Sequence, residues 1–399
     1  MNRPRPDSVA VAALLTTLVA FGPMSTDMYL PSLPALVADF DSDVPTVQLT
    51  LSAFLVAFAV GMLVYGPLSD RFGRRPVLLG AIAVYLLASI VCALAPSIEW
   101  LIGARVLQAL GCCAGPVLGR AVVRDVYGRE RAASVLSYMG TAMALAPAIG
   151  PIAGGWLQVA YGWQATFWVL TAFSGLALLG VLLMLDETNA QKNPYATSAL
   201  GLLRSYTALL THRSYIGYVA TISACYSVIF CFISGSSFVL IQVVGLTADL
   251  YGVCFASIVI GYMSGTFVSG RFGRRVGVDR LILTGSAVST LAGLAMAGFA
   301  WAGEATVATI VIPQMVAMFG VGLVFPNCQA GAIGPFPTMA GAASALLGFC
   351  QMGVAAAVGM GIGHAFDGTA RPMASGIALA SLLTFLSFRL IVWPVRARS

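Results

Sequence analysis

The chain has 399 residues, of which 59% are hydrophobic and only 9% are charged, and its mean hydropathy is +0.91. A soluble protein carries about 25% charged residues, so this composition excludes an ordinary soluble enzyme, a disordered protein and a nucleic-acid-binding protein. The formal net charge of +6 comes almost wholly from arginine, and no basic stretch is interleaved with aromatic residues as nucleic-acid binding would require.

Hydrophobic stretches long enough to cross a membrane recur along the whole chain. A transmembrane helix needs about 20 apolar residues, and twelve stretches meet that need. Because they lack the alternation of barrel strands, we predict an all-α membrane protein with twelve transmembrane helices. The predicted spans are 9–34, 47–68, 77–95, 98–121, 132–156, 163–185, 214–238, 249–270, 279–300, 305–327, 341–363 and 372–388.

The basic residues gather on one side of these spans. With the N-terminus inside, 19 of the 21 Lys and Arg residues lie in cytoplasmic loops or at cytoplasmic span ends, and only Arg105 and Arg371 lie elsewhere. Cytoplasmic loops of membrane proteins carry such an excess of Lys and Arg. We therefore predict a multi-pass protein with both termini in the cytoplasm.

One acid and one arginine lie deep inside predicted spans. Asp27 is in the first span and Arg105 in the fourth, each roughly 10 Å below the outer boundary at about 1.5 Å per residue. Ionisable side chains are costly in the membrane interior and mark functional sites, and removal from water favours the neutral form of a carboxyl group. We interpret Asp27 and Arg105 as proton-coupling residues; the alternative is a fixed structural ion pair between them.

A loop rich in glycine and arginine joins the second and third spans. It reads Gly66-Pro67-Leu68-Ser69-Asp70-Arg71-Phe72-Gly73-Arg74-Arg75-Pro76, and residues 71–75 recur as residues 271–275 at the equivalent place. We predict a conformational latch in which Asp70 meets an arginine or the positive N-terminus of a helix in the outward-open state. Its predicted residues are Gly66, Asp70, Arg71, Gly73, Arg74 and Arg75. The alternative is a basic loop that serves topology alone.

The repeated loop indicates two halves of six helices each. Residues 186–213 form the only long polar connector, so we predict an N-terminal bundle over 1–185, a cytoplasmic linker over 186–213 and a C-terminal bundle over 214–399. Repeated halves with a binding site between them near the membrane midplane are typical of secondary transporters. The predicted fold is therefore two pseudo-symmetric six-helix bundles.

Small residues cluster in the fifth span. The cluster consists of Gly150, Pro151, Gly154 and Gly155. Such residues kink a helix and let a partner helix approach closely. The alternative is ordinary helix packing without a role in transport.

Aromatic and polar residues on several spans predict a substrate site. On the seventh span they follow helical spacing and so share one face, and an apolar cavity with a few polar anchors suits drug-like ligands. The candidate substrate-binding residues are Met24, Leu30, Gln108, Tyr138, Tyr226, Phe230, Phe349 and Gln351. Helix packing or lipid contact is the alternative for this set.

Four stretches resemble a known family, the major facilitator superfamily, and its drug–proton antiporters. The loop 66–76 resembles the signature loop of the superfamily, and residues 26–31 resemble the first span of the bicyclomycin- and chloramphenicol-resistance branch. Residues 105–111 match the fourth-span pattern R-x-x-Q-x-x-G. Residues 146–155 resemble the antiporter motif G-x-x-x-G-P-x-x-G-G, with Ala146 in place of its first glycine.

The resemblance implies the major facilitator fold and proton-driven export of small, mostly apolar compounds by alternating access. It also implies a place in a bacterial inner membrane, with protons, a small-molecule substrate and the lipid bilayer as partners of a monomer. The runner-up function is proton-coupled transport of a metabolite such as a nucleoside or an amino-acid derivative.

Other function classes lack their signatures in this sequence. A membrane enzyme would need a phosphate-binding loop, a metalloprotease HExxH or a serine-hydrolase elbow, and none is present. A channel would need polar rings that line a pore, and the two-half repeat favours alternating access instead. We therefore predict no enzyme activity, no catalytic residues, no cofactor and no metal.

Overall fold

The computed structural model describes residues 8–127, 129–189, 192–194 and 197–396. Within these ranges eleven segments are helical, long and apolar enough to cross a membrane. A further helix, α7 (Arg129–Tyr161), occupies the place of the fifth predicted span. The described part of the chain holds no strand, so the all-α prediction is confirmed.

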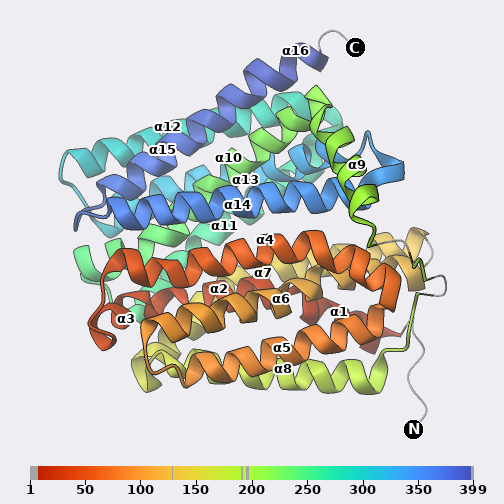
Figure 1. Ribbon diagram of the computed structural model, residues 1–399. Helices are drawn as coiled ribbons and strands as arrows, with labels where there is room; N and C mark the ends of the chain where they lie inside the picture. Colours follow the sequence, from red (N-terminus) through yellow and green to blue (C-terminus); the bar gives the residue numbers. More distant parts are fainter. Residues whose placement is uncertain (1–7, 128, 190–191, 195–196, 397–399) are drawn as a thin grey trace.

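The N-terminal bundle consists of helices α1 to α8, drawn from red to yellow-green in Figure 1. Its first membrane segment is broken into α1 (Val9–Val19), α2 (Phe21–Asp27), the short turn η1 (Leu30–Ser32) and α3 (Leu33–Asp39). The others are α4 (Val44–Phe72), α5 (Arg74–Ala93), α6 (Ile98–Val126), α7 and α8 (Gln164–Met184). The break has a local cause, because Pro31 lacks the N–H that would bond to the carbonyl of Asp27 in a continuous helix.

The C-terminal bundle follows the linker, which itself contains a helix, α9 (Ala199–Leu210). Its membrane segments are α10 (Arg213–Ser237) with η2 (Phe238–Val243), α11 (Ala248–Val276), α12 (Val278–Trp301) and α13 (Val307–Ile333). After the turn η3 (Pro337–Met339) come α14 (Ala340–Ala365) and α15 (Arg371–Ser387), the latter continued by η4 (Phe388–Val392) and α16 (Trp393–Arg396). The predicted fold of two six-helix bundles is confirmed, while the predicted domain limits stay a prediction.

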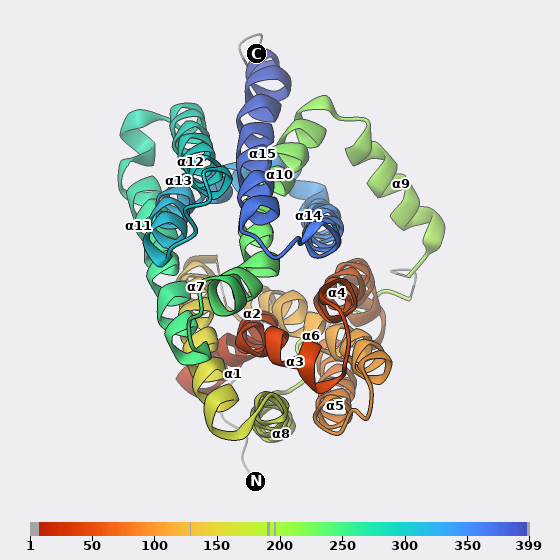
Figure 2. The same ribbon diagram turned by 90° about the vertical axis from the view of Figure 1, so that its left-hand side faces the viewer.

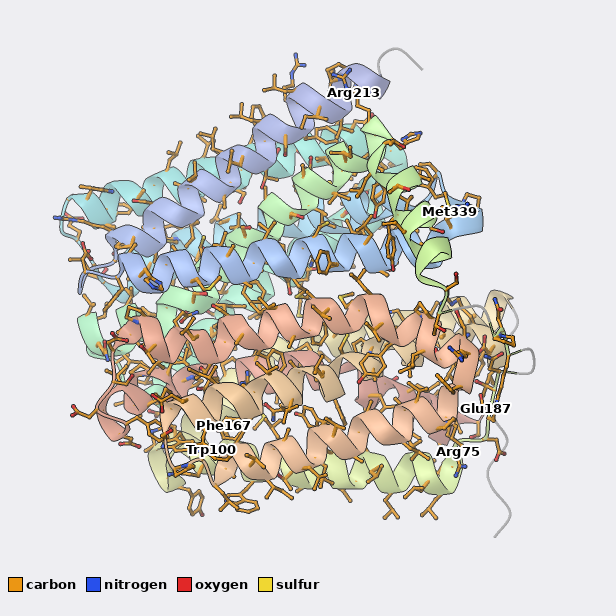
Figure 3. The ribbon with its side chains drawn as sticks, viewed as in Figure 1. Arg75, Trp100, Phe167, Glu187, Arg213 and Met339 are labelled. Atoms are coloured by element: carbon orange, nitrogen blue, oxygen red, sulfur yellow. The ribbon has the colours of Figure 1, made fainter. Side chains whose placement is uncertain are left out.

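The two bundles meet along two helix pairs, α4 with α14 and α7 with α11 (Figure 2). We call the end of the molecule that carries the loop 66–76 the loop end, and the opposite end the far end. Figure 3 places Arg75 and Glu187 toward the loop end, and Trp100 and Phe167 toward the far end.

Toward the far end the backbones of α7 and α11 approach each other closely. A Cβ atom added to Gly252 of α11 would overlap the carbonyl oxygen of Pro151, and one added to Gly155 would overlap that of Ala248. Toward the loop end a cavity of about 460 Å³ separates the N-terminal bundle from the start of α14. The molecule is therefore closed at the far end and open at the loop end.

Candidate functional site

Asp27 ends helix α2 at the break in the first membrane segment, and its side chain is only 4% exposed. The hydroxyl group of Thr26 donates a hydrogen bond of 2.9 Å to Oδ1 of Asp27. The turn η1, which begins three residues after Asp27, contacts α10 and α11 of the other bundle. Among the described residues no basic side chain forms an ion pair with Asp27, and a buried carboxylate in that position is costly unless a proton neutralises it.

Arg105 is fully buried within the N-terminal bundle. Its Nη1 donates hydrogen bonds to the backbone carbonyl of Ser25 at 3.1 Å and to Oε1 of Gln108 at 2.6 Å. The guanidinium carbon lies 4.2 Å from the ring centre of Phe54, and such a contact stabilises a desolvated cation. Arg105 thus holds α2 through a carbonyl two residues before Asp27.

Asp27 belongs to the broken segment and Arg105 of α6 donates a hydrogen bond to that segment, but the two side chains do not meet. Arg105 binds backbone and amide oxygens of its own bundle, whereas Asp27 accepts a hydrogen bond from Thr26. In this conformation no ion pair joins the two side chains. Their role in proton coupling stays a prediction.

The glycines of α7 bring this helix against the segment that carries Asp27. A Cβ atom on Gly154 would overlap the backbone carbonyl of Met28, and one on Gly150 would lie 3.2 Å from Cβ of Asp27. Gly155 instead faces the start of α11 in the other bundle. Helix α7 therefore contacts both the surroundings of Asp27 and the C-terminal bundle.

The variant Gly154→Ala is expected to lose about 1–3 kcal/mol of stability, because its methyl group has no space beside Met28. The measurement is the apparent Tm of the purified protein. Gly140→Ala is the matched control, since it lies on the same helix and a Cβ atom there would meet nothing within 4 Å. Equal Tm values for the two variants would contradict the close approach.

The loop 66–76 is organised by acids of its own bundle and the adjoining linker. Arg74 forms ion pairs with Asp70 and with Asp125 at the end of α6. Glu187, which follows α8, accepts hydrogen bonds from the backbone N–H groups of Arg74 at 2.9 Å and Arg75 at 3.3 Å. These N–H groups begin helix α5, where the helix dipole favours a carboxylate.

Among the described residues, none of the predicted latch residues forms a hydrogen bond or an ion pair with the C-terminal bundle in this conformation. Gly73 adopts φ = 107° and a Cβ atom there would overlap the carboxylate of Glu187, so the turn requires glycine. Arg71 donates a hydrogen bond of 2.7 Å to the hydroxyl group of Thr197 in the linker. A Cβ atom on Gly66 would meet nothing within 4 Å. A latch that closes only in the other conformation stays a prediction.

The cavity at the loop end lies between α4, α6 and α7 on one side and α9 and α14 on the other. Its charged lining residues are Asp70, Arg74, Arg120 and Arg124. From the sequence we predicted only a topological role for Arg120 and Arg124, outside the candidate site. Their spacing of four residues inside a span end was the available signal, because that spacing places two side chains on one helix face.

None of the seven predicted substrate-binding residues whose side chains the structure describes lines this cavity. Tyr226 of α10 and Gln351 of α14 lie close enough for their side chains to interact. The rings of Tyr226 and Phe230 lie 4.9 Å apart in α10. Leu30 and Gln108 are fully buried inside the N-terminal bundle, where Gln108 donates a hydrogen bond to Ser89. Gln351 is buried, and Met24 and Phe349 are partly buried. The side chain of Tyr138 lies outside the described part of the chain.

Comparison with known sequences gives relatives over nearly the whole chain. The Major Facilitator Superfamily profile matches residues 15–360. The chain is 32% identical over 387 residues to an uncharacterized MFS-type transporter, YdgK, of Bacillus subtilis (strain 168), covering 96% of this chain and 95% of that protein. It is 30% identical over 351 residues to multidrug resistance protein D of Escherichia coli (strain K12), covering 88% and 87%. A bicyclomycin resistance protein homolog of Haemophilus influenzae (strain ATCC 51907 / DSM 11121 / KW20 / Rd) is 28% identical over 387 residues, covering 95% and 94%.

Solved structures resemble this one in fold. The crystal structure of a D-xylose-proton symporter has a TM-score of 0.74 at 13% sequence identity, covering 94% of this chain and 97% of that one. A bacterial homolog of the human lysosomal transporter Spinster, solved in an inward-facing conformation, has a TM-score of 0.70 at 16% identity, covering 98% and 99%. The profile match, the relatives and the shared fold agree: this chain belongs to the major facilitator superfamily.

Proposed function

We propose that the chain is a proton-coupled exporter of small, mostly hydrophobic, drug-like compounds. Its relatives include proteins named for multidrug resistance and for bicyclomycin resistance, and its family consists of transporters. The observation that carries the proton part is Asp27, which is buried at a helix break between the bundles without an ion-pair partner among the described residues. Taking up a proton there removes a buried charge and so shifts the balance between two arrangements of the bundles.

The arrangement of the bundles supports alternating access. The contacts of α7 with α11 close the far end, while the cavity opens at the loop end. With the predicted topology, the open end and both termini lie in the cytoplasm of a bacterial cell, and the chain acts as a monomer in the inner membrane. A compound would enter the cavity from the cytoplasm and leave after the bundles rock to open the far end.

Purified protein in liposomes tests this function. An imposed pH gradient is expected to drive uphill transport of chloramphenicol or bicyclomycin, and an uncoupler is expected to stop it. Expression in a sensitive bacterium is expected to lower susceptibility to at least one such drug. Downhill, pH-independent movement would contradict proton coupling. Gradient-driven transport of nucleosides or amino-acid derivatives without any drug transport would favour the metabolite transporter.

The variant Gly252→Val is expected to disfavour the conformation seen here, because its side chain would overlap the backbone of Pro151 in α7. A reporter cysteine, Ser52→Cys, sits in the buried contact of α4 with α14. Its labelling by a membrane-impermeant maleimide is expected to rise severalfold in the Gly252 variant. Gly270→Val on the same helix is the control, since a Cβ atom there would meet nothing within 4 Å. Equal labelling in the Gly252 and Gly270 variants would contradict closure of the far end by the contact of α7 with α11.

A further inference from the structure

Two arginines of α6 line the cavity at the loop end without an acidic partner. Arg120 and Arg124 lie four residues apart on one helix face, so their like charges are close together. Among the described residues, neither forms an ion pair or a hydrogen bond. An uncompensated pair of this kind raises the positive potential of the space that it faces.

The remaining charges around the cavity leave this positive potential in place. Asp70 is the one acid in the described lining, and it is bound to Arg74, which also engages Asp125. The opposite wall is formed by the first residues of α14, which begins at Ala340. The N-terminus of a helix carries a partial positive charge. Both walls therefore favour a negative group between them.

Apart from Asn193, Tyr206 and Ser344, the rest of the lining is apolar or small. Met62, Val117 and Leu136 belong to the N-terminal bundle, while Ala342 and Ala345 come from α14. Small residues on the α14 side leave the space open, and the apolar side chains opposite offer contact to a hydrophobic body. The shape and the charge together suit an amphiphilic molecule rather than a small hydrated ion.

We propose that this cavity recognises compounds that carry an acidic group, such as a carboxylate, on an apolar body. The inference names a substrate class for the exporter proposed above and rests on that function. Guanidinium groups bind carboxylates through charge-assisted hydrogen bonds, so Arg120 and Arg124 hold the acidic group while the apolar wall contacts the body. The same positive potential disfavours cationic drugs.

Membrane topology alone does not account for Arg120. Arginines that only set the orientation of a protein in the membrane can remain in water. The exposed Arg204 and Arg213 do so. Arg120 is half-buried and lies six residues before the end of α6 at Val126, about 9 Å inside the helix at 1.5 Å per residue. It is partly removed from water there without a counter-ion among the described residues, and an acidic ligand supplies one.

Binding of three matched naphthalene compounds to the full-length protein tests the proposal. The purified chain in phosphatidylcholine nanodiscs is titrated with naphthalene-2-acetate, with its uncharged methyl ester and with the cationic 2-(naphthalen-2-yl)ethylamine. The acid is expected to bind about tenfold more tightly than the other two. This difference corresponds to one charge-assisted hydrogen bond that the ester and the amine do not form. Arg120→Gln is expected to reduce this preference to less than about threefold, and Arg120→Lys to keep part of it.

Arg204→Gln is the matched control, because Arg204 is exposed on α9 and lies outside the cavity lining. It is expected to keep the full preference. Arg124→Gln replaces the first variant if Arg120→Gln does not elute as a folded protein. The proposal is overturned if the wild-type protein binds the acid no more tightly than the ester, or if both cavity variants keep the wild-type preference.

Two further measurements identify the source of the acid and distinguish a failure of this inference from a failure of the exporter function. Phosphatidylglycerol in the nanodiscs lowers the affinity for naphthalene-2-acetate if a lipid headgroup is the natural acid, and leaves it unchanged if the acid is a soluble compound. Gradient-driven export of an uncharged drug is measured on the same wild-type preparation. Export without acid preference rejects this inference alone, whereas acid preference without any export rejects the exporter function.

Discussion

Replacing Asp27 with asparagine is expected to abolish export driven by a proton gradient, down to the level of liposomes without protein. Asparagine keeps the size of the side chain and its amide oxygen can still accept the hydrogen bond from Thr26, so the fold is expected to survive. The amide does not bind and release a proton in the physiological range. The coupling between proton and substrate therefore disappears, while downhill exchange of substrate remains and becomes independent of pH.

Asp39→Asn is the matched control for this experiment. Asp39 ends α3 in the same broken segment, and its side chain is exposed. Transport by this variant is expected to equal that of the wild-type protein. Undiminished gradient-driven export by the Asp27 variant would remove Asp27 from the mechanism, whatever the control shows.

The membrane helices follow from the sequence to within a few residues, and their ends show what hydropathy leaves out. The second span was predicted over 47–68, whereas α4 runs from Val44 to Phe72. Asp43 caps its start by accepting a hydrogen bond of 2.8 Å from the backbone of Thr46, and Gly73 ends it with a positive φ. Hydropathy measures the part of a helix that faces lipid, while polar caps and turn residues determine where the helix begins and ends.

The break in the first span illustrates a second limit. Residues 9–34 were predicted as one helix, and the structure has separate pieces, with Asp27 at the break. Pro31 provided the signal, because its ring nitrogen cannot donate a hydrogen bond to the carbonyl of Asp27. Prolines are tolerated in many membrane helices, so their presence alone does not show which helix is interrupted.

The sequence could not show in which direction the side chains of the candidate site point. Counting residues gave Asp27 and Arg105 a matched depth, but the rotation of α2 against α6 determines whether they meet. In the structure Arg105 binds the carbonyl of Ser25 instead. The cavity was also missed, because an empty space is made by small residues such as Ala342 and Ala345 of α14, and small residues are common throughout membrane helices.

Replacing Arg105 with lysine is expected to have the second large effect, although the charge is conserved. The guanidinium group reaches the backbone carbonyls of Ser25 and Thr50 and the side chain of Gln108 at once. A lysine has a single nitrogen on a flexible chain and cannot replace that planar fork. Each buried acceptor left without its donor costs about 1–3 kcal/mol, so the apparent Tm is expected to fall and gradient-driven export to drop by about tenfold or more.

The contrast between the Arg105 and Asp27 variants separates two roles that one transport assay would confuse. A residue that carries the proton is needed for coupling but not for the fold, so Asp27→Asn is expected to keep its Tm and lose gradient-driven export. A residue that positions the broken helix is needed for both, so Arg105→Lys is expected to lose both. Arg204→Lys, at an exposed position of α9, controls for the substitution itself. Wild-type Tm and transport in Arg105→Lys would show that its charge alone matters and that the bonds to Ser25 and Thr50 do not position the helix.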